Sequence, residues 1–200
     1  MAAKKPYHKE NLRRDLLDAG RAYVKAHGHL NLSVRTIAQQ VGVSPGAPYH
    51  HFPDRRSFLL ALATEGFEEM LSGTREVTAG NMSPADKLKR MGTLFIRFAD
   101  ENRHLLDLMY ESELTTPTLD PQLQKYQTLG HQALRQHIVD AVGGLSDDEA
   151  DLRVVAYWSA IYGFSSMRKK GVIHASHEGL ATVDIADALV ERAALAALVF

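Results

Sequence analysis

The sequence T-I-A-Q-Q-V-G-V-S-P-G-A-P-Y-H-H-F, residues Thr36–Phe52, indicates the architecture of the first part of the chain. Ala38 is small enough for a second helix to cross close to it, and Gly42 allows the positive φ of a tight turn. Ser44 and Pro45 are typical of the first positions of another helix. The pattern predicts a helix-turn-helix whose second helix faces a DNA major groove, although two packed core helices would produce a similar pattern.

Helical periodicity continues on both sides of this segment, and no alternating strand pattern is present. We therefore expect an all-α protein with about nine helices and no sheet. The expected helices cover residues 9–27 and 33–41, a short helix from residue 44, a longer one after residue 54, and then 83–101, 102–111, 121–142, 146–170 and 184–200.

The charge is distributed unevenly along the chain. Residues 1–57 contain ten lysines and arginines against four acidic residues, a net charge of +6, whereas residues 58–200 contain 13 and 20, a net charge of −7. A basic segment of this kind favours a polyanionic partner, although two solvated faces with a chance imbalance would also explain it. The charge pattern divides the chain into two expected domains, namely residues 1–57, which would bind DNA, and residues 58–200.

Composition excludes several other classes of protein. The chain contains no cysteine, so disulfides and thiolate chemistry are excluded, and it has no apolar run long enough for a membrane span. The polar, basic start is unlike a signal peptide, so the expected location is the cytoplasm. The common nucleotide-binding, metalloprotease and hydrolase motifs are missing, so we expect no enzyme and no cofactor. The histidines near His174 and at His50 and His51 leave metal binding as a minor alternative.

The segment from Leu32 to Leu60 resembles the N-terminal region of the tetracycline-repressor (TetR) family of transcriptional regulators. The matching features are Ile37-Ala38, Gly42-Val43-Ser44, Tyr49, His51-Phe52 and a basic pair before an apolar helix. Ala47 and Pro48 depart from the family pattern, and Pro48 cannot donate a hydrogen bond to the carbonyl of Ser44. The segment W-S-A-I-Y-G from Trp158 is similar to a signature of one subgroup, with Tyr162 in place of its histidine.

This resemblance implies which residues contact DNA, at phosphates or at base edges. The implied DNA-binding residues are Ser33, Arg35, Ser44, Pro45, Gly46, Tyr49, His50 and Arg55. Arg55 matches a basic phosphate contact of the family. Lys4, Lys5 and Lys9 would form a basic arm, although ordinary solvation explains them as well. Tyr49 could instead be partly buried, and we expect His51 to be mainly structural, beside Phe52.

The resemblance also implies a ligand cavity in the second domain, which would take an unidentified small-molecule effector. The candidate ligand-binding residues are Met91, Phe95, Phe98, Met109, Tyr110, Tyr126, Trp158 and Tyr162, although an ordinary core would account for any one of them. The last helix is apolar on more than one side, which predicts a homodimer contact, with a buried monomer core as the alternative. The candidate interface residues are Ala186, Leu189, Val190, Ala193 and Ala197.

Taken together, these features predict a ligand-responsive dimeric transcriptional regulator, most often a repressor in such families. Its third helix would enter the major groove of a palindromic double-stranded operator, with half-sites roughly 34–36 Å apart. The main alternative is a helical small-molecule-binding or scaffold protein that no longer reads DNA. A metal-dependent enzyme is the third possibility.

Overall fold

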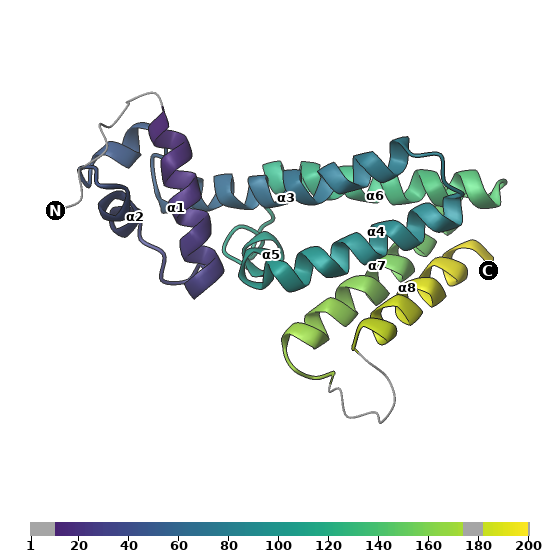
Figure 1. The fold of residues 1–200 in the computed structure, drawn as a ribbon. Coiled ribbons are helices and arrows are strands. Elements are labelled where there is room, and N and C mark those ends of the chain that lie inside the picture. Colours follow the sequence, from purple (N-terminus) through teal and green to yellow (C-terminus); the bar gives the residue numbers. More distant parts are fainter. Residues whose placement is uncertain (1–10, 174–181, 200) are drawn as a thin grey trace. The chain divides into compact units, whose positions relative to one another are not determined.

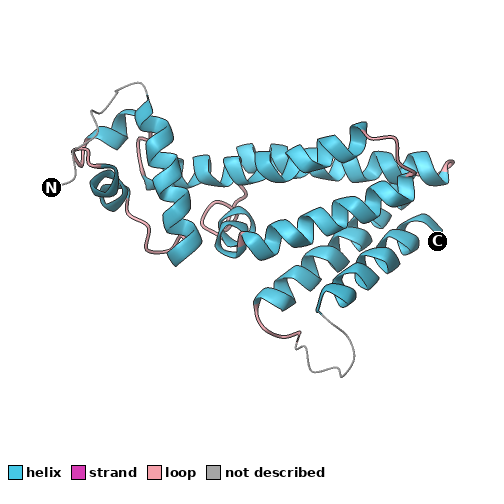
Figure 2. Ribbon diagram, viewed as in Figure 1, coloured by secondary structure: helices cyan, strands magenta, loops and turns pink. Residues whose placement is uncertain are grey.

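The computed structural model describes residues 11–173 and 182–199, and these residues form helices and loops only (Figures 1 and 2). The prediction of an all-α protein is confirmed. The lysines expected to form a basic arm and the histidine-containing loop near His174 lie outside the described residues. The helices are α1 (Leu12–His27), α2 (Val34–Val41), the 3-10 helix η2 (Ala47–His50), α3 (Arg55–Ala79), α4 (Pro84–Glu101), α5 (Arg103–Tyr110), α6 (Pro121–Val142), α7 (Asp147–Lys169) and α8 (Thr182–Val199).

The chain divides into two compact units. Unit 1 combines the residues up to Gly66 with His104–Leu123, and unit 2 combines Phe67–Arg103 with the residues from Gln124 onwards. The long helix α3 begins in the first unit and ends in the second. Most of α5 and the loop after it therefore pack with the N-terminal helices, a long-range association that local sequence patterns do not indicate. The functional division expected at residue 57 stays a prediction.

Unit 1 has a core in which α1 and the first turns of α3 pack very closely. Leu16 and Leu17 of α1 are fully buried, as are Phe58 and Leu59 of α3. The approach is possible because residue 20 is glycine: a Cβ atom there would lie 2.5 Å from Cζ of Phe58. Such a separation is far below van der Waals contact, so this helix crossing requires glycine.

The turn after α2 has the conformation that the sequence predicts. Gly42 adopts φ 82°, and its N–H bonds to the carbonyls of Ala38 and Gln39. Val43 also donates to the carbonyl of Ala38, at 3.0 Å. The left-handed glycine thus ends α2 and turns the chain toward η2.

Unit 2 contains a close contact of α4 with α7 and α8. The hydroxyl of Tyr157 donates a hydrogen bond to the carbonyl of Leu88 at 2.6 Å, and burial raises the pKa of this phenol. A Cβ atom at Gly92 would lie 2.7 Å from the same hydroxyl and 3.1 Å from Cγ1 of Val190. Residue 92 must therefore be small for α7 and α8 to approach α4 this closely.

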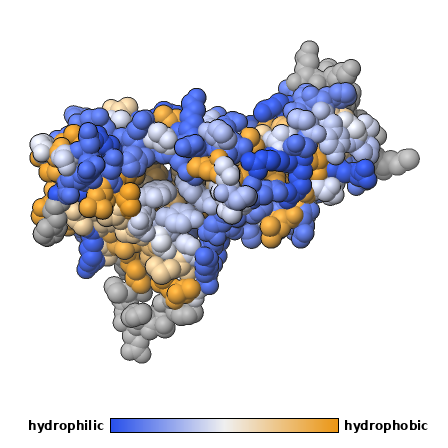
Figure 3. Space-filling view, turned by 180° about the vertical axis from the view of Figure 1, so that it is seen from behind, coloured by the Kyte–Doolittle hydropathy of each residue, from blue (hydrophilic) through white to orange (hydrophobic). Residues whose placement is uncertain are grey.

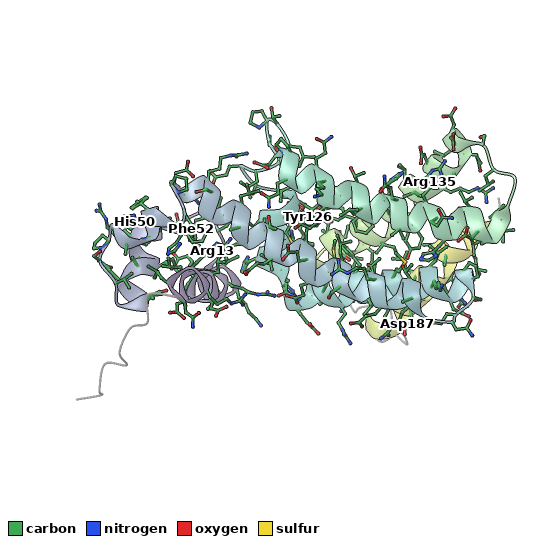
Figure 4. The ribbon with its side chains drawn as sticks, turned by 90° about the horizontal axis from the view of Figure 1, so that it is seen from above. Arg13, His50, Phe52, Tyr126, Arg135 and Asp187 are labelled. Carbon is green, nitrogen blue, oxygen red and sulfur yellow. The ribbon has the colours of Figure 1, made fainter. Side chains whose placement is uncertain are left out.

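Polar contacts join α6 to its neighbours in unit 2. Arg135 pairs with both Asp147 and Asp151, and His131 contacts the same Asp151 carboxylate at 3.0 Å (Arg135 is labelled in Figure 4). The hydrogen bond from His131 and the contact with Arg135 lower the pKa of Asp151. These side chains are exposed to solvent to a large extent, so the ion pairs add little to the free energy of unfolding and mainly fix how α6 lies against α7.

Among the described residues, no helix is long and apolar enough to cross a membrane.

Candidate nucleic-acid interface

Helices α2 and η2 together have one polar exposed side and one buried apolar side. Ile37 and Ala38 are completely buried, and Pro48 is buried beneath η2. Tyr49 is 50% exposed, and His50 is exposed on the surface of unit 1 (Figure 4). Most of the residues that the resemblance assigned to DNA lie on the exposed side: Ser33, Arg35, Ser44, Pro45, Gly46, Tyr49 and His50.

The third helix differs from the expected α-helix. It is a four-residue 3-10 helix, in which Tyr49 N–H bonds to the carbonyl of Gly46 at 3.2 Å. Ahead of it, Ala47 N–H bonds to the carbonyl of Ser44 at 3.0 Å. Because Pro48 has no N–H, the α-helical bond from residue 48 to Ser44 cannot form, and the i to i+3 pattern replaces it. The segment consequently presents few side chains beyond those of Tyr49 and His50.

The start of α2 carries donors that could meet a phosphate. Ser33 precedes the helix in an extended conformation, and its hydroxyl makes no capping hydrogen bond. Backbone N–H groups in the first turn of a helix have no helical acceptor, and they favour anions. Arg35, one residue into the helix, is exposed. The combination of an uncapped helix start with an exposed arginine is suited to a nucleic-acid backbone.

Arg55 has internal partners, in contrast to the free phosphate contact implied by the resemblance. Its Nε donates to the carbonyl of Leu32 at 2.8 Å, and one terminal nitrogen donates to the carbonyls of His29 and Leu30. Its other terminal nitrogen pairs with the carboxylate of Glu113. The guanidinium is therefore engaged with groups of its own unit.

Arg13 is a further basic residue of this unit that the sequence did not single out. Its guanidinium lies 5.4 Å from the ring centroid of Phe52, a cation–π distance (Figure 4). His51 is exposed, and its ring centroid lies 6.4 Å from that of Phe52. The sequence signal for Arg13 is its position on the polar side of α1, and this signal is unspecific because many solvated arginines occupy such positions.

Asp54 is the acidic residue between η2 and α3. Its carboxylate accepts a hydrogen bond from the backbone N–H of Ser57 at 2.7 Å, and this bond lowers the pKa of Asp54. The Ser57 hydroxyl in turn donates to the Asp54 carbonyl. This arrangement caps the start of α3, so the carboxylate of Asp54 stabilises the first turn of that helix.

The expected ligand-binding residues fall in both units of the chain. Phe95, Trp158 and Tyr162 form an aromatic cluster between α4 and α7, with ring centroids 4.5 Å apart for the first pair and 6.2 Å for the second. Met91 and Phe98 are buried on α4. Tyr126 lies elsewhere in unit 2. Met109 and Tyr110 belong to unit 1.

Tyr126 of α6 is held by two residues of α3. Its ring stacks on Phe67 with centroids 5.8 Å apart, and its hydroxyl donates to the carboxylate of Glu68 at 2.8 Å. The hydrogen bond to Glu68 raises the pKa of the Tyr126 phenol. Both contacts fix α6 against α3, so the side chain has a structural explanation within unit 2.

The residues expected to form the dimer interface are mostly buried within the subunit itself. Ala186, Val190, Ala193 and Ala197 are each at most 8% exposed, and Leu189 is partly exposed. The physical reason is the small residue at position 92, which lets α8 pack its alanines against α4 and α7. These four residues therefore belong to the monomer core, which was the alternative interpretation.

Other apolar side chains of α7 and α8 are exposed instead. Their exposed fractions are 63% for Leu152, 54% for Val155, 47% for Leu195 and 66% for Val199. In the space-filling view, apolar surface gathers on the side of unit 2 that carries α7 and α8 (Figure 3). Exposed apolar residues on two neighbouring helices are typical of a contact surface.

The helices and the turn at Gly42 place this chain in the class of all-α proteins with a helix-turn-helix. Residues 16–62 match the model of the tetR family of bacterial regulatory proteins, and residues 88–195 match the tetracyclin repressor-like C-terminal domain. The second match alone covers more than half of the chain. The protein belongs to the TetR family of transcriptional regulators, and its members are not enzymes. The resemblance seen in the N-terminal motif is thereby confirmed.

Individual relatives agree with this assignment. The chain is 38% identical over 71 residues to an HTH-type transcriptional repressor of Mycobacterium tuberculosis, a match that spans 35% of this chain and 38% of that repressor. A protein of unknown function from Rhodococcus sp. RHA1 has the same fold, with a TM-score of 0.79 at 23% identity over 98% of this chain and 97% of that one.

A TetR-like regulator from Mycobacterium smegmatis, solved in complex with proflavine, also has the same fold. Its TM-score is 0.62 at 19% identity, with 92% of this chain and 95% of that chain covered.

No group of three or more histidine or acidic residues with the geometry of a metal site occurs within residues 11–173 and 182–199.

Proposed function

We propose that the protein is a dimeric, effector-responsive transcriptional repressor that binds a palindromic DNA operator. The observation that carries the proposal is the exposure of Arg35, Tyr49 and His50 on a helix-turn-helix whose other side is buried. Family membership supports DNA as the partner. The repressor of Mycobacterium tuberculosis that matches the N-terminal region supports repression as the direction of control.

In this proposal, α2 and η2 meet the DNA with different groups. Tyr49 and the donors at Ser33 bind phosphates, and Arg35 bonds to a base edge or to a phosphate. Pro45 and Gly46 lead the 3-10 segment and contact thymine methyl groups. His50 extends the same exposed surface. The short 3-10 segment offers few base-specific hydrogen-bonding groups, so much of the binding free energy comes from the backbone of the duplex.

The effector site is proposed at the aromatic cluster of Phe95, Trp158 and Tyr162 in unit 2. Edge-to-face and offset rings of this kind accommodate a planar aromatic molecule, because it can add one more ring to the arrangement. The Mycobacterium smegmatis regulator with the same fold, solved with proflavine, supports an effector of this chemical class. Effector binding would favour a conformation of lower operator affinity, to the extent that the two conformations bind the effector differently.

Trp158 is the only tryptophan of the chain, which makes the effector proposal directly measurable. Proflavine should quench the fluorescence of Trp158 in a saturable manner and weaken binding to the operator. A Tyr126→Phe variant serves as the control, because Tyr126 lies outside the cluster. Absence of saturable quenching by proflavine would remove the support for a planar aromatic effector.

The DNA proposal is tested by selecting bound sequences from a pool of random duplexes. The expected result is an enriched palindrome, with an affinity that falls steeply as the salt concentration rises, because bound phosphates release counterions. A pool that shows no enrichment, together with binding that does not respond to salt, would contradict the proposal. That result would favour a helical binding or scaffold protein that does not read DNA.

A further inference from the structure

The guanidinium of Arg55 is bonded to four groups of unit 1. Nε donates to the carbonyl of Leu32 at 2.8 Å, and one terminal nitrogen donates to the carbonyls of His29 at 2.7 Å and Leu30 at 3.0 Å. The other terminal nitrogen pairs with the Glu113 carboxylate. All three nitrogens of the fork are thus engaged inside the unit. To reach a phosphate, the side chain would have to abandon several charge-assisted hydrogen bonds.

The three carbonyls belong to the turn that joins α1 to α2. The turn is anchored by its side chains as well, since His29 and Leu32 are 7% and 2% exposed. Leu32 is followed directly by Ser33, the residue that precedes α2. The position of the Leu32 carbonyl therefore sets where α2 starts, and with it where Arg35 is presented.

We propose that Arg55 is a positioning residue for DNA binding: it holds the α1–α2 turn through three carbonyls and does not contact phosphate. This inference rests on the proposed function and assigns Arg55 a different part in it. Glu113 extends the arrangement, because its carboxylate orients the guanidinium from the loop after α5. Segment 104–123, which belongs to unit 1, thereby contributes to the geometry of the DNA-binding surface.

Replacement of Arg55 by lysine distinguishes a positioning residue from a phosphate contact. Lysine retains the positive charge, so it can replace an arginine that merely neutralises a phosphate. It has three donors on one nitrogen, so it cannot reproduce a planar fork that bonds to three carbonyls and a carboxylate. A phosphate contact also contributes about 0.9 to the slope of log affinity against log salt, whereas a residue that touches no phosphate makes no direct contribution to that slope.

The experiment measures binding of the full chain to the selected palindrome at several salt concentrations. R55K and R55Q should both bind about tenfold more weakly than the unmodified protein, which corresponds to the loss of one or two hydrogen bonds that hold the turn. Both should retain its salt slope. The proposal is overturned if R55K binds normally while R55Q lowers the slope by about one. Arg90→Gln, which removes an exposed arginine from unit 2, is the matched control and should change neither quantity.

E113Q provides a second test that is less demanding for folding, since the Glu113 side chain is 47% exposed. Removal of an acidic group near DNA should by electrostatics alone strengthen binding. The positioning proposal predicts the opposite, a several-fold weakening at an unchanged salt slope. Asp15→Asn removes the same charge from α1 of the same unit and should leave binding unchanged or slightly stronger. The proposal fails if E113Q behaves like Asp15→Asn.

Amide hydrogen exchange separates this proposal from the proposed function. The backbone amides of Leu32 and Ile37, which donate to the carbonyls of His29 and Ser33, should exchange faster in R55K than in the unmodified protein, and this comparison requires no DNA. If the unmodified protein binds no duplex, the proposed function fails and the part of Arg55 in DNA binding fails with it. Unchanged exchange in a folded R55K overturns the positioning of the turn itself, whatever the DNA measurements show.

Discussion

Gly20 of α1 lies directly against the ring of Phe58 in α3, so closely that a Cβ atom at position 20 would be 2.5 Å from Cζ and 2.8 Å from Cε1. Phe58 is completely buried, so its ring cannot move aside without disturbing the core. Within unit 1, this contact fixes α1 against α3, the helix that follows η2.

Substitution of Gly20 by alanine should therefore destabilise unit 1 by about 1–3 kcal/mol, because overpacking exceeds the gain in helix propensity. Gly163→Ala is the matched control: Gly163 also lies within a helix, but a Cβ atom there would meet nothing within 4 Å. That variant should be about 0.5–1 kcal/mol more stable. Urea unfolding measures both, and equal effects of the two substitutions would contradict the packing argument.

A second close contact predicts rescue of one substitution by another. Gly92→Ala should destabilise unit 2 by about 1–3 kcal/mol, because the new methyl group collides with the Tyr157 hydroxyl at 2.7 Å. Tyr157→Phe alone should cost about 1 kcal/mol through the lost hydrogen bond to Leu88. The double variant should be more stable than the sum of the two single effects predicts. A strictly additive cycle would show that Val190 and Ile161 limit the space instead.

The stability of the protein should fall in mild acid. Burial lowers the pKa of both His29 and His137, so the folded protein binds fewer protons than the unfolded chain between the folded and unfolded values. The contribution of these two neutral histidines to the free energy of unfolding is complete above the pKa of histidine in the unfolded chain, about 6.5. It is lost as the pH falls below that pKa.

His137 allows this pH dependence to be tested. It is 4% exposed, accepts or donates a hydrogen bond with Thr78 at 3.2 Å, and lies near Lys87, which also lowers its pKa, and Asp140, which opposes that effect. His137→Gln should reduce the difference in unfolding free energy between pH 8 and pH 5.5. Gln136→Asn, at the preceding position of α6, removes no titratable group and should leave this difference unchanged. An unchanged difference in His137→Gln would contradict the assignment to burial.

Arg35 should contribute directly to DNA binding. Arg35→Ala is expected to weaken operator binding by about 1–3 kcal/mol if the residue contacts a guanine, and to lower the salt slope by about one if it contacts a phosphate. Fluorescence anisotropy over a series of salt concentrations distinguishes the two. The dimer should remain intact. Unaltered affinity and slope would exclude Arg35 from the interface.

The exposed apolar residues of α7 and α8 should carry the dimer contact. Val155→Asp is expected to shift the protein toward monomers, because the charge would be desolvated in an apolar interface. Leu129→Asp places the same charge at an apolar residue of α6 that is 45% exposed, and it should leave the dimer unchanged. Analytical ultracentrifugation measures both. Dissociation by Leu129→Asp with an intact Val155→Asp dimer would place the interface elsewhere.

The sequence alone predicted the all-α class, most helix boundaries and the turn at Gly42, because these depend on local periodicity, caps and the conformational freedom of glycine. Ser83 and Ser146 cap their helices as such residues should, each accepting from the backbone N–H three positions later. The resemblance to the TetR family also singled out Arg35, Tyr49 and His50, and the structure exposes all three. These signals are contained within a few consecutive residues.

Only the tertiary structure decided the partners of Arg55, the location of α5 in unit 1 and the burial of the α8 alanines. A basic residue before a helix has the same local pattern whether it meets phosphate or three carbonyls of its own chain. An apolar helix likewise has the same pattern in a monomer core and in a dimer contact. These outcomes depend on residues far away in the sequence, such as Glu113 for Arg55 and Gly92 for α8, and packing between distant segments is not encoded in any short window.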